Sequence, residues 1–180
     1  CRFAAPHPVN TPTPGRVLIV GPDPLARAGL AAILAGMPNL TIVGQGEPSS
    51  SLADLTAVFA PDVVLWDLGW AGDVALGQLA AAVELASVPA DTPVPVVVLV
   101  ADERAAPAVW QAGVRGVLTR SAPVQAVASA LLAAIDGLAV AEPRLLPGLV
   151  EPSAPPAAPS EPLTPRELEV LGWMAQGYAN

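Results

Sequence analysis

Short runs of β-branched and aliphatic residues alternate with longer Ala- and Leu-rich stretches through most of this 180-residue chain. The short runs lack the apolar–polar alternation of a strand with one face in solvent. Each is therefore expected to be a strand buried on both faces, as in a parallel sheet. The runs are VLIV (17–20), LTIVG (40–44), DVVLW (62–66), PVVVLV (95–100) and VRGVL (114–118).

A helix is predicted after each of these strands. The first has clear limits, because Asp23 can cap it, Pro24 fits its first turn and Gly36 can end it. Crossovers between parallel strands are right-handed and place helices on both faces of the sheet. The sequence therefore predicts an α/β fold, a (βα)5 doubly wound parallel sheet in the order 2-1-3-4-5. The predicted helices are 24–34, 51–59, 74–86, 103–112 and 123–138.

Pro-rich segments flank this pattern. Residues 1–15 show no periodicity and are expected to be a disordered tail, which leaves 16–140 as the α/β domain. Residues 141–162, AEPRLLPGLVEPSAPPAAPSEP, are predicted to be a Pro/Ala-rich linker. In polyproline II conformation such a linker would reach about 60 Å, at about 3 Å per residue. The open alternative is that its leucines dock on the preceding domain.

A well-capped helix is predicted after the linker, in 163–180, LTPRELEVLGWMAQGYAN. Thr164 is a suitable N-cap, Pro165 fits the first turn and Glu167 completes a capping box with Thr164. Gly177 marks the end of the helix. This segment is expected to begin a second, all-α domain.

Composition excludes several classes of function. A net charge of −8 argues against broad nucleic-acid binding by this stretch. One Cys and one His exclude a disulfide framework, a Cys-based zinc site and a histidine metal site. The apolar runs are too short or too interrupted to cross a bilayer and no signal peptide is visible, so a cytoplasmic location without a membrane segment is predicted. A chain that begins with Cys rather than Met is expected to be a fragment.

The quoted motifs carry a family resemblance. LTPRELEVLGWMAQGYAN resembles the first helix and turn of the LuxR-type helix-turn-helix domain. VLIVGPDPLARAGL, PDVVLWDLGWAG and the run from VVVLVADE through GVRGVLTRSAP resemble the flavodoxin-like receiver domain of NarL/FixJ-type response regulators. The resemblance implies a transcription factor and not an enzyme. In the family a sensor kinase supplies a phosphoryl group to a receiver aspartate, and that state sets dimerisation and DNA binding.

Asp67 falls at the phosphoacceptor position of the family, but the other pocket positions depart from its pattern. The acidic pair that ends strand 1 is replaced, as are the hydroxyl residue of strand 4, the lysine of strand 5 and the aromatic switch residue of strand 5. The residues at these positions are Gly21-Pro22, Val100, Arg120 and Val117, respectively.

These departures argue against phosphorylation. Phosphoryl transfer brings negative charges together, so it depends on positioned cations. Mg²⁺ needs about six oxygen ligands, and Asp67 alone recruits it poorly. Asp23 is better suited to capping the first helix. We therefore predict no metal, no cofactor (Mg²⁺ only if the pocket is functional) and no sensor kinase as partner. The Asp67 carboxylate is expected to pair with Arg120 or to accept from loop amides.

The sequence thus predicts a DNA-binding transcriptional regulator that forms a homodimer without phosphorylation, with the apolar helix 123–138 as a contact surface. Three alternatives stay open: a conventional regulator phosphorylated on Asp67, a receiver-like domain gated by a small molecule, and a protein-interaction module without DNA binding. No base-contacting residue is named, because the recognition helix that the resemblance implies lies beyond Asn180. Trp66 and Trp110 are expected to pack against helices, and Trp70 is expected to be buried.

Overall fold

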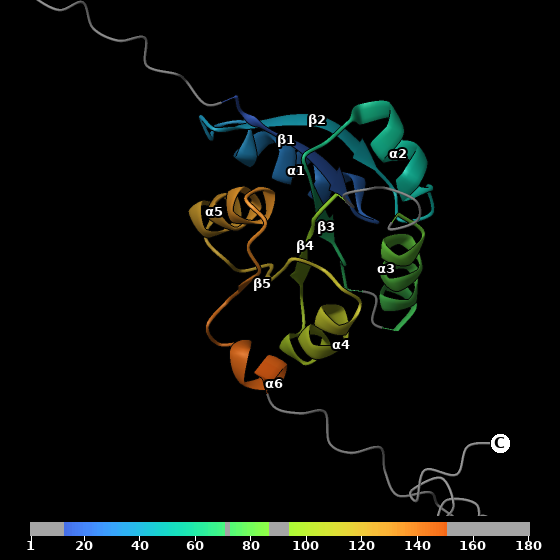
Figure 1. Cartoon of the computed structure of the whole chain (residues 1–180), viewed down its shortest axis with the longest axis vertical. Helices are drawn as coiled ribbons and strands as arrows, with labels where there is room; N and C mark the ends of the chain where they lie inside the picture. The colour runs from blue at the N-terminus through green and yellow to red at the C-terminus, as the bar shows by residue number, and fades with distance from the viewer. Residues whose placement is uncertain (1–12, 71–72, 87–93, 151–180) are drawn as a thin grey trace, which may run out of the picture. The chain divides into compact units, whose positions relative to one another are not determined.

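The computed structural model describes residues 13–70, 73–86 and 94–150. Its centre is a six-stranded sheet in the order β2-β1-β3-β4-β5-β6, and every neighbouring pair is parallel. Helices cover both of its faces (Figure 1). The strands are β1 Gly15–Val20, β2 Leu40–Gly46, β3 Val63–Asp67, β4 Val96–Val100, β5 Gly116–Thr119 and β6 Val140–Ala141.

The helices follow the strands in alternation, as predicted. They are α1 Pro24–Leu34, α2 Leu52–Phe59, α3 Asp73–Ala86, α4 Ala106–Gln111, α5 Val124–Ile135 and α6 Leu146–Val150. The flavodoxin-like order predicted for the first five strands is confirmed. Among the described residues, no helix combines the length and the apolar character needed to cross a bilayer.

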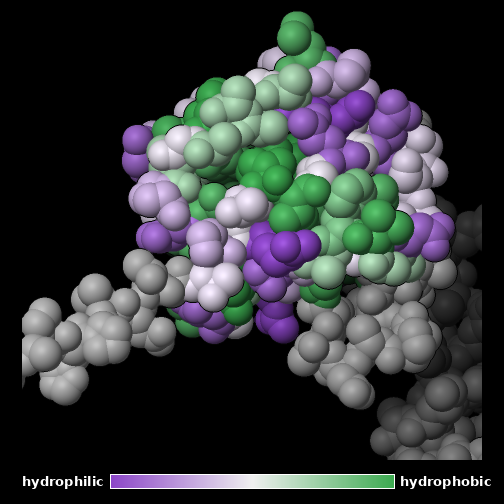
Figure 2. All heavy atoms as spheres, turned by 90° about the horizontal axis from the view of Figure 1, so that it is seen from above, coloured by the Kyte–Doolittle hydropathy of each residue, from purple (hydrophilic) through white to green (hydrophobic). Residues whose placement is uncertain are grey.

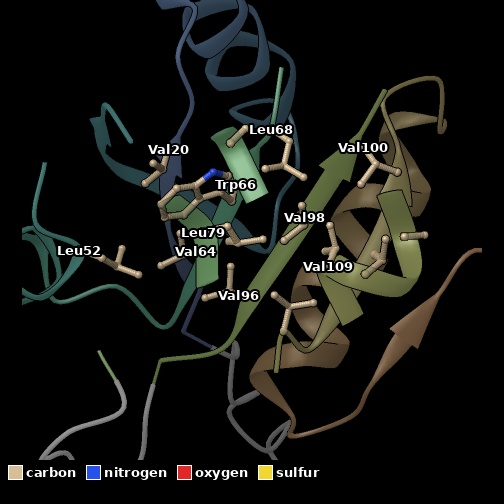
Figure 3. Close-up of a cluster of buried hydrophobic side chains, with 14 of the residues drawn as sticks. Val20, Leu52, Val64, Trp66, Leu68, Leu79, Val96, Val98, Val100 and Val109 are labelled. Carbon is tan, nitrogen blue, oxygen red and sulfur yellow. The ribbon is translucent and has the colours of Figure 1, made fainter. Parts of the chain in front are cut away.

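The side chains of the strands build two cores, one on each face of the sheet. One core joins alternate strand residues to α2, α3 and α4, and Trp66 lies in its middle with Val20, Val64 and Leu79 (Figure 3). Trp66 is buried, and Trp110 packs against this core while staying partly exposed. The other core joins the intervening strand residues to α1 and α5. Because both faces are covered, β3 and β4 consist entirely of buried residues.

Two helices differ from the sequence prediction by more than one residue, each for a local reason. The segment predicted as one helix over 103–112 is a 3-10 turn, Glu103–Ala105, followed by α4. Pro107 has no N–H, so it cannot donate the α-helical hydrogen bond to the carbonyl oxygen of Glu103, four residues earlier. The last predicted helix ends at Ile135 rather than 138, because Gly137 adopts a φ of 82° and turns the chain.

The folded unit continues past residue 140. Val140 and Ala141 form β6 beside Gly116 and Val117 of β5. Leu145, 3% exposed, and Leu149 pack against the core that contains α4, so the start of the predicted linker docks on the sheet. The compact unit extends to Leu149. The tail 1–12 and the segment 151–180, with most of the linker, Trp173 and the predicted helix-turn-helix start, lie outside the described residues.

The surface carries a few large exposed apolar side chains. Figure 2 shows apolar residues gathered in the middle of the face seen from above, with polar residues around them. The exposed large apolar residues of the described ranges are Leu25, Ile33, Val58, Trp70, Leu138 and Leu146.

Candidate functional site at the carboxyl end of the sheet

Asp67 is the last residue of β3, at the edge of the sheet where the strands end. It is 1% exposed. The register of β3 with β1 pairs Trp66 with Val20, which places Asp67 beside the residues that follow β1. A buried carboxylate is costly unless charges and hydrogen bonds compensate it. The burial of Asp67 is therefore tolerated only because nearby groups compensate its charge.

Two groups hold the Asp67 carboxylate. Nη2 of the Arg120 guanidinium donates to Oδ2 of Asp67 at 3.0 Å. The backbone N–H of Gly69 donates to Oδ1 at 3.1 Å. Both contacts were suggested by the sequence, because parallel strands bring their carboxyl ends to one edge. The negative charge of Asp67 is thus balanced from within the chain.

Trp70 covers the outer side of this ion pair. The Arg120 guanidinium carbon lies 5.1 Å from the centroid of the Trp70 ring, a cation–π arrangement. Trp70 is 85% exposed, so the expectation that it is buried was wrong. The reason is local: Gly69 has a φ of 67° and turns the chain, and Leu68 takes the buried place before it.

The chain at Gly21, one of the two residues that replace the acidic pair, packs tightly against Asp67. A Cβ on Gly21 would lie 3.2 Å from Cβ of Asp67, so the chain after β1 packs closely on Asp67. Asp23 is exposed, and its Oδ1 accepts from the N–H of Leu25 at 2.8 Å as the N-cap of α1. Within the described ranges, no cluster of three or more His, Cys, Asp or Glu residues is placed to hold a metal ion.

Arg27 is a second cation near this edge, and the sequence analysis missed it. It is 9% exposed, and its Nη1 donates to the carbonyl oxygen of Gly21. Its Nη2 lies 3.7 Å from Glu47 Oε1, while its buried Nε has no hydrogen-bond partner. The sequence did indicate its position, because Arg27 lies three residues before Leu30 and seven before Leu34. This helical spacing places Arg27 on the buried face of α1.

The two valine positions lie where the resemblance placed them and are aliphatic and buried. Val100 ends β4 and is 1% exposed, and Val117 is 0% exposed between Val98 of β4 and Ala141 of β6. A cavity of about 50 Å³ opens beside Val100 and Trp70. Since one water occupies about 30 Å³ of liquid volume, this cavity has room for only one or two waters. It is lined by Leu68, Gly69, Trp70, Leu76, Val100, Ala101, Asp102 and Ala105.

A polar network that the sequence analysis did not foresee lies next to the site. Glu142 accepts from the backbone N–H and the hydroxyl of Thr119, and Arg144 bonds Glu142, Thr119 and Ser121. Burial alone would raise the pKa of Glu142. The hydrogen bonds from Thr119 and Arg144 outweigh this effect, so the pKa of Glu142 lies below its ordinary value.

The chain is similar to several curated transcriptional regulators, although no family model matches it. It is 30% identical over 172 residues to the transcriptional regulatory protein LiaR of Bacillus subtilis, covering 92% of this chain and 78% of that protein. It is 31% identical over 177 residues to the probable transcriptional regulatory protein NarL of Mycobacterium tuberculosis, covering 95% of this chain and 79% of that protein.

Solved structures show the same fold. The response regulator ChrA of a heme-sensing two-component system aligns with a TM-score of 0.59 at 26% identity, covering 92% of this chain and 77% of that one. The receiver domain of the Mycobacterium tuberculosis NarL aligns with a TM-score of 0.57 at 23% identity, covering 70% of this chain and 99% of that one. Sequence relatives and fold agree, and the chain belongs to the NarL/FixJ-type response regulators.

Proposed function

We propose that this protein is a DNA-binding transcriptional regulator whose receiver domain works without phosphorylation of Asp67. The relatives LiaR and NarL are named transcriptional regulatory proteins, which supports the first part. The ion pair between Asp67 and Arg120 carries the second part. In this pair the carboxylate of Asp67, at the phosphoacceptor position, is buried, and its negative charge is already balanced by the guanidinium of Arg120.

The residues of the site do not fit Mg²⁺. The cation prefers an octahedron of oxygen ligands, usually with one or two carboxylates. Here Asp67 is a single carboxylate, while Arg27 and Arg120 bring two guanidinium groups to the same edge of the sheet. A guanidinium offers only N–H donors and repels a divalent cation. Phosphoryl transfer to Asp67 assisted by Mg²⁺ is therefore not expected at this site.

The Asp67 carboxylate is also poorly placed as a nucleophile. Oδ2 accepts from Arg120 and Oδ1 from Gly69, and the group is almost fully buried. An attacking oxygen must lie in line with the leaving group of the phosphodonor. The close packing of Gly21 and Pro22 on Asp67 and Gly69 occupies the side where the acidic pair would stand. Both effects disfavour transfer to Asp67.

Intact mass spectrometry after incubation with acetyl phosphate and Mg²⁺ tests this proposal. We expect no gain of a phosphoryl group. A receiver domain that carries the acidic pair, treated in the same reaction, is the positive control for the phosphodonor. A mass gain of one phosphoryl group that is lost in Asp67→Asn would overturn the proposal and favour the conventional regulator.

The remaining parts of the proposed function concern DNA and assembly. We expect the protein with its complete helix-turn-helix domain to bind promoter DNA equally well with and without acetyl phosphate, as measured by fluorescence anisotropy. Sedimentation of the untreated protein at micromolar concentration is expected to show a dimer. A monomer that dimerises only after phosphodonor treatment would contradict this, and absence of DNA binding would favour a protein-interaction module.

A further inference from the structure

A cavity of about 160 Å³ lies between α1 and α5, on the face of the sheet toward which Asp67 and Arg120 point. Leu34, Leu99 and Val127 form its buried walls, and Ile33, 54% exposed, stands at its mouth. Apart from one residue, every lining side chain is apolar. The lining residues are Leu30, Ile33, Leu34, Leu99, Arg120, Ala122, Val124 and Val127.

Arg120 is the one charged group in this wall, and it has donors to spare. Among the described residues, the only hydrogen bond of its guanidinium joins Nη2 to Asp67 Oδ2. Trp70 covers one face of the guanidinium without accepting an N–H. A guanidinium carries several further N–H donors in a plane that suits a carboxylate. The side chain is 23% exposed, so these donors are partly withdrawn from water.

We propose that this cavity binds a small amphipathic carboxylate, with its apolar body among the leucines and valines and its carboxylate on the free N–H groups of Arg120. Small-molecule sites are mostly apolar with a few convergent polar groups, which is the pattern here. The volume is below the range of about 300–1,000 Å³ for drug-sized ligands, so the ligand is a single ring or a short chain. The charge of Arg120 selects an anion over a neutral analogue.

This inference rests on the proposed function and deepens it, because it names the class of molecule that would take the place of the phosphoryl group as signal. Arg120 contacts both the ligand and Asp67, so the ligand binds next to the degenerate pocket. The competing occupant is an apolar side chain from a second copy of this chain, entering past Ile33. That occupant needs no anion and does not depend on Arg120.

Benzoate and benzyl alcohol are suitable probes, because they share a ring and differ in the charge of the head group. Isothermal titration of the folded protein is expected to show saturable benzoate binding, at least about tenfold tighter than benzyl alcohol. Arg120→Gln alone leaves the Asp67 carboxylate buried without its partner, so the double variant Asp67→Asn/Arg120→Gln is used instead. It removes both charges, leaves a polar side chain at each position and is expected to weaken benzoate binding at least about tenfold.

Two further variants complete the design. Arg104→Gln removes an arginine that is paired with Asp102 on the surface, and it is expected to bind benzoate like the wild type. Val124→Phe fills the cavity and is expected to abolish binding of both probes, with folding checked by thermal unfolding. Equal affinity for the two probes, or benzoate binding that survives the loss of Arg120, would overturn the inference.

The failure of this inference is distinguishable from failure of the proposed function. No benzoate binding together with no phosphoryl gain on Asp67 overturns the ligand site alone. A phosphoryl gain overturns the proposed function whatever benzoate does. If benzoate does not bind and Ile33→Glu converts a dimer to a monomer, the cavity is an interface between copies and the carboxylate site is rejected.

Discussion

The backbone N–H and the hydroxyl of Thr119 both donate to the same carboxylate oxygen of Glu142, each at 2.9 Å. Thr119 ends β5, and Glu142 directly follows β6. Arg144 extends the network, with its Nη1 at 3.2 Å from Glu103 beside α4. The chain that leaves the sheet is therefore fastened to the tip of β5. Arg120, the next residue after Thr119, holds Asp67 on the opposite side.

Glu142→Ala should destabilise the fold. Thr119 is 4% exposed, so the substitution leaves its backbone N–H and hydroxyl without their main acceptor. Leaving such buried groups unsatisfied costs about 1–3 kcal/mol, measurable by urea unfolding. Glu103→Ala is the matched control, because its exposed ion pair with Arg144 is expected to contribute at most about 1 kcal/mol. Equal effects of the two substitutions would show that the Thr119 contacts add nothing.

Acid should weaken the same network. The pKa of Glu142 is lowered in the folded protein from an ordinary value of 4.5, so the unfolded chain binds its proton more readily. Its contribution to stability is present above pH 4.5 and is lost as the pH falls through the lower folded value. Urea unfolding between neutral and acidic pH should show this decline, and Glu142→Gln should flatten it. Asp102→Asn, at a surface ion pair screened by solvent, should leave the profile nearly unchanged.

Arg120→Ala should lower the free energy of unfolding more than a double substitution that removes both charges of the pair. It leaves the carboxylate of Asp67 buried without its guanidinium, and breaking a buried ion pair in this way costs about 3–5 kcal/mol. The partial exposure of Arg120 places the expected value at the low end of that range. Asp67→Asn/Arg120→Gln should be closer to wild type. A double-mutant cycle by chemical denaturation measures the coupling, and additive effects of the two single changes would contradict it.

Truncation of two tryptophans should lower the stability of the fold by very different amounts. Trp66→Ala removes a side chain that is 1% exposed in the core and should cost about 3–5 kcal/mol. Trp70→Ala removes an exposed ring whose cation–π contact with Arg120 is expected to contribute about 0.5–1 kcal/mol. Thermal unfolding gives both values. Iodide quenching should fall in Trp70→Ala, and unchanged quenching would show that the ring is covered in solution.

The sheet was predictable because the sequence pattern of a buried strand occurs several times and is strong each time. The valine-rich runs of β3 and β4 leave few alternatives to strands buried on both faces, and right-handed crossovers then restrict the order. The ion pair of Asp67 and Arg120 followed from the same logic, since Asp67 ends β3, Arg120 directly follows β5, and both strands end at the same edge of the sheet. Neither prediction required knowledge of side-chain conformations.

The missed features depend on single local events. β6 is a two-residue strand within a Pro/Ala-rich segment, and its pairing arises from tertiary contact rather than propensity. The exposure of Trp70 follows from the positive φ of Gly69, which a tryptophan's apolar character does not reveal. Arg27 was overlooked because an arginine in a first turn is usually solvated, whereas here it reaches back to the carbonyl of Gly21.

The short strand β6 has a consequence for solubility. Without it, β5 would present its unpaired backbone groups at the rim of the sheet, where an extended segment of another polypeptide could add itself. Two residues, Val140 and Ala141, occupy that position, and the chain then turns into α6. So short an edge strand offers few free N–H and C=O groups to another polypeptide, which limits edge-to-edge aggregation of a sheet rich in valine and leucine.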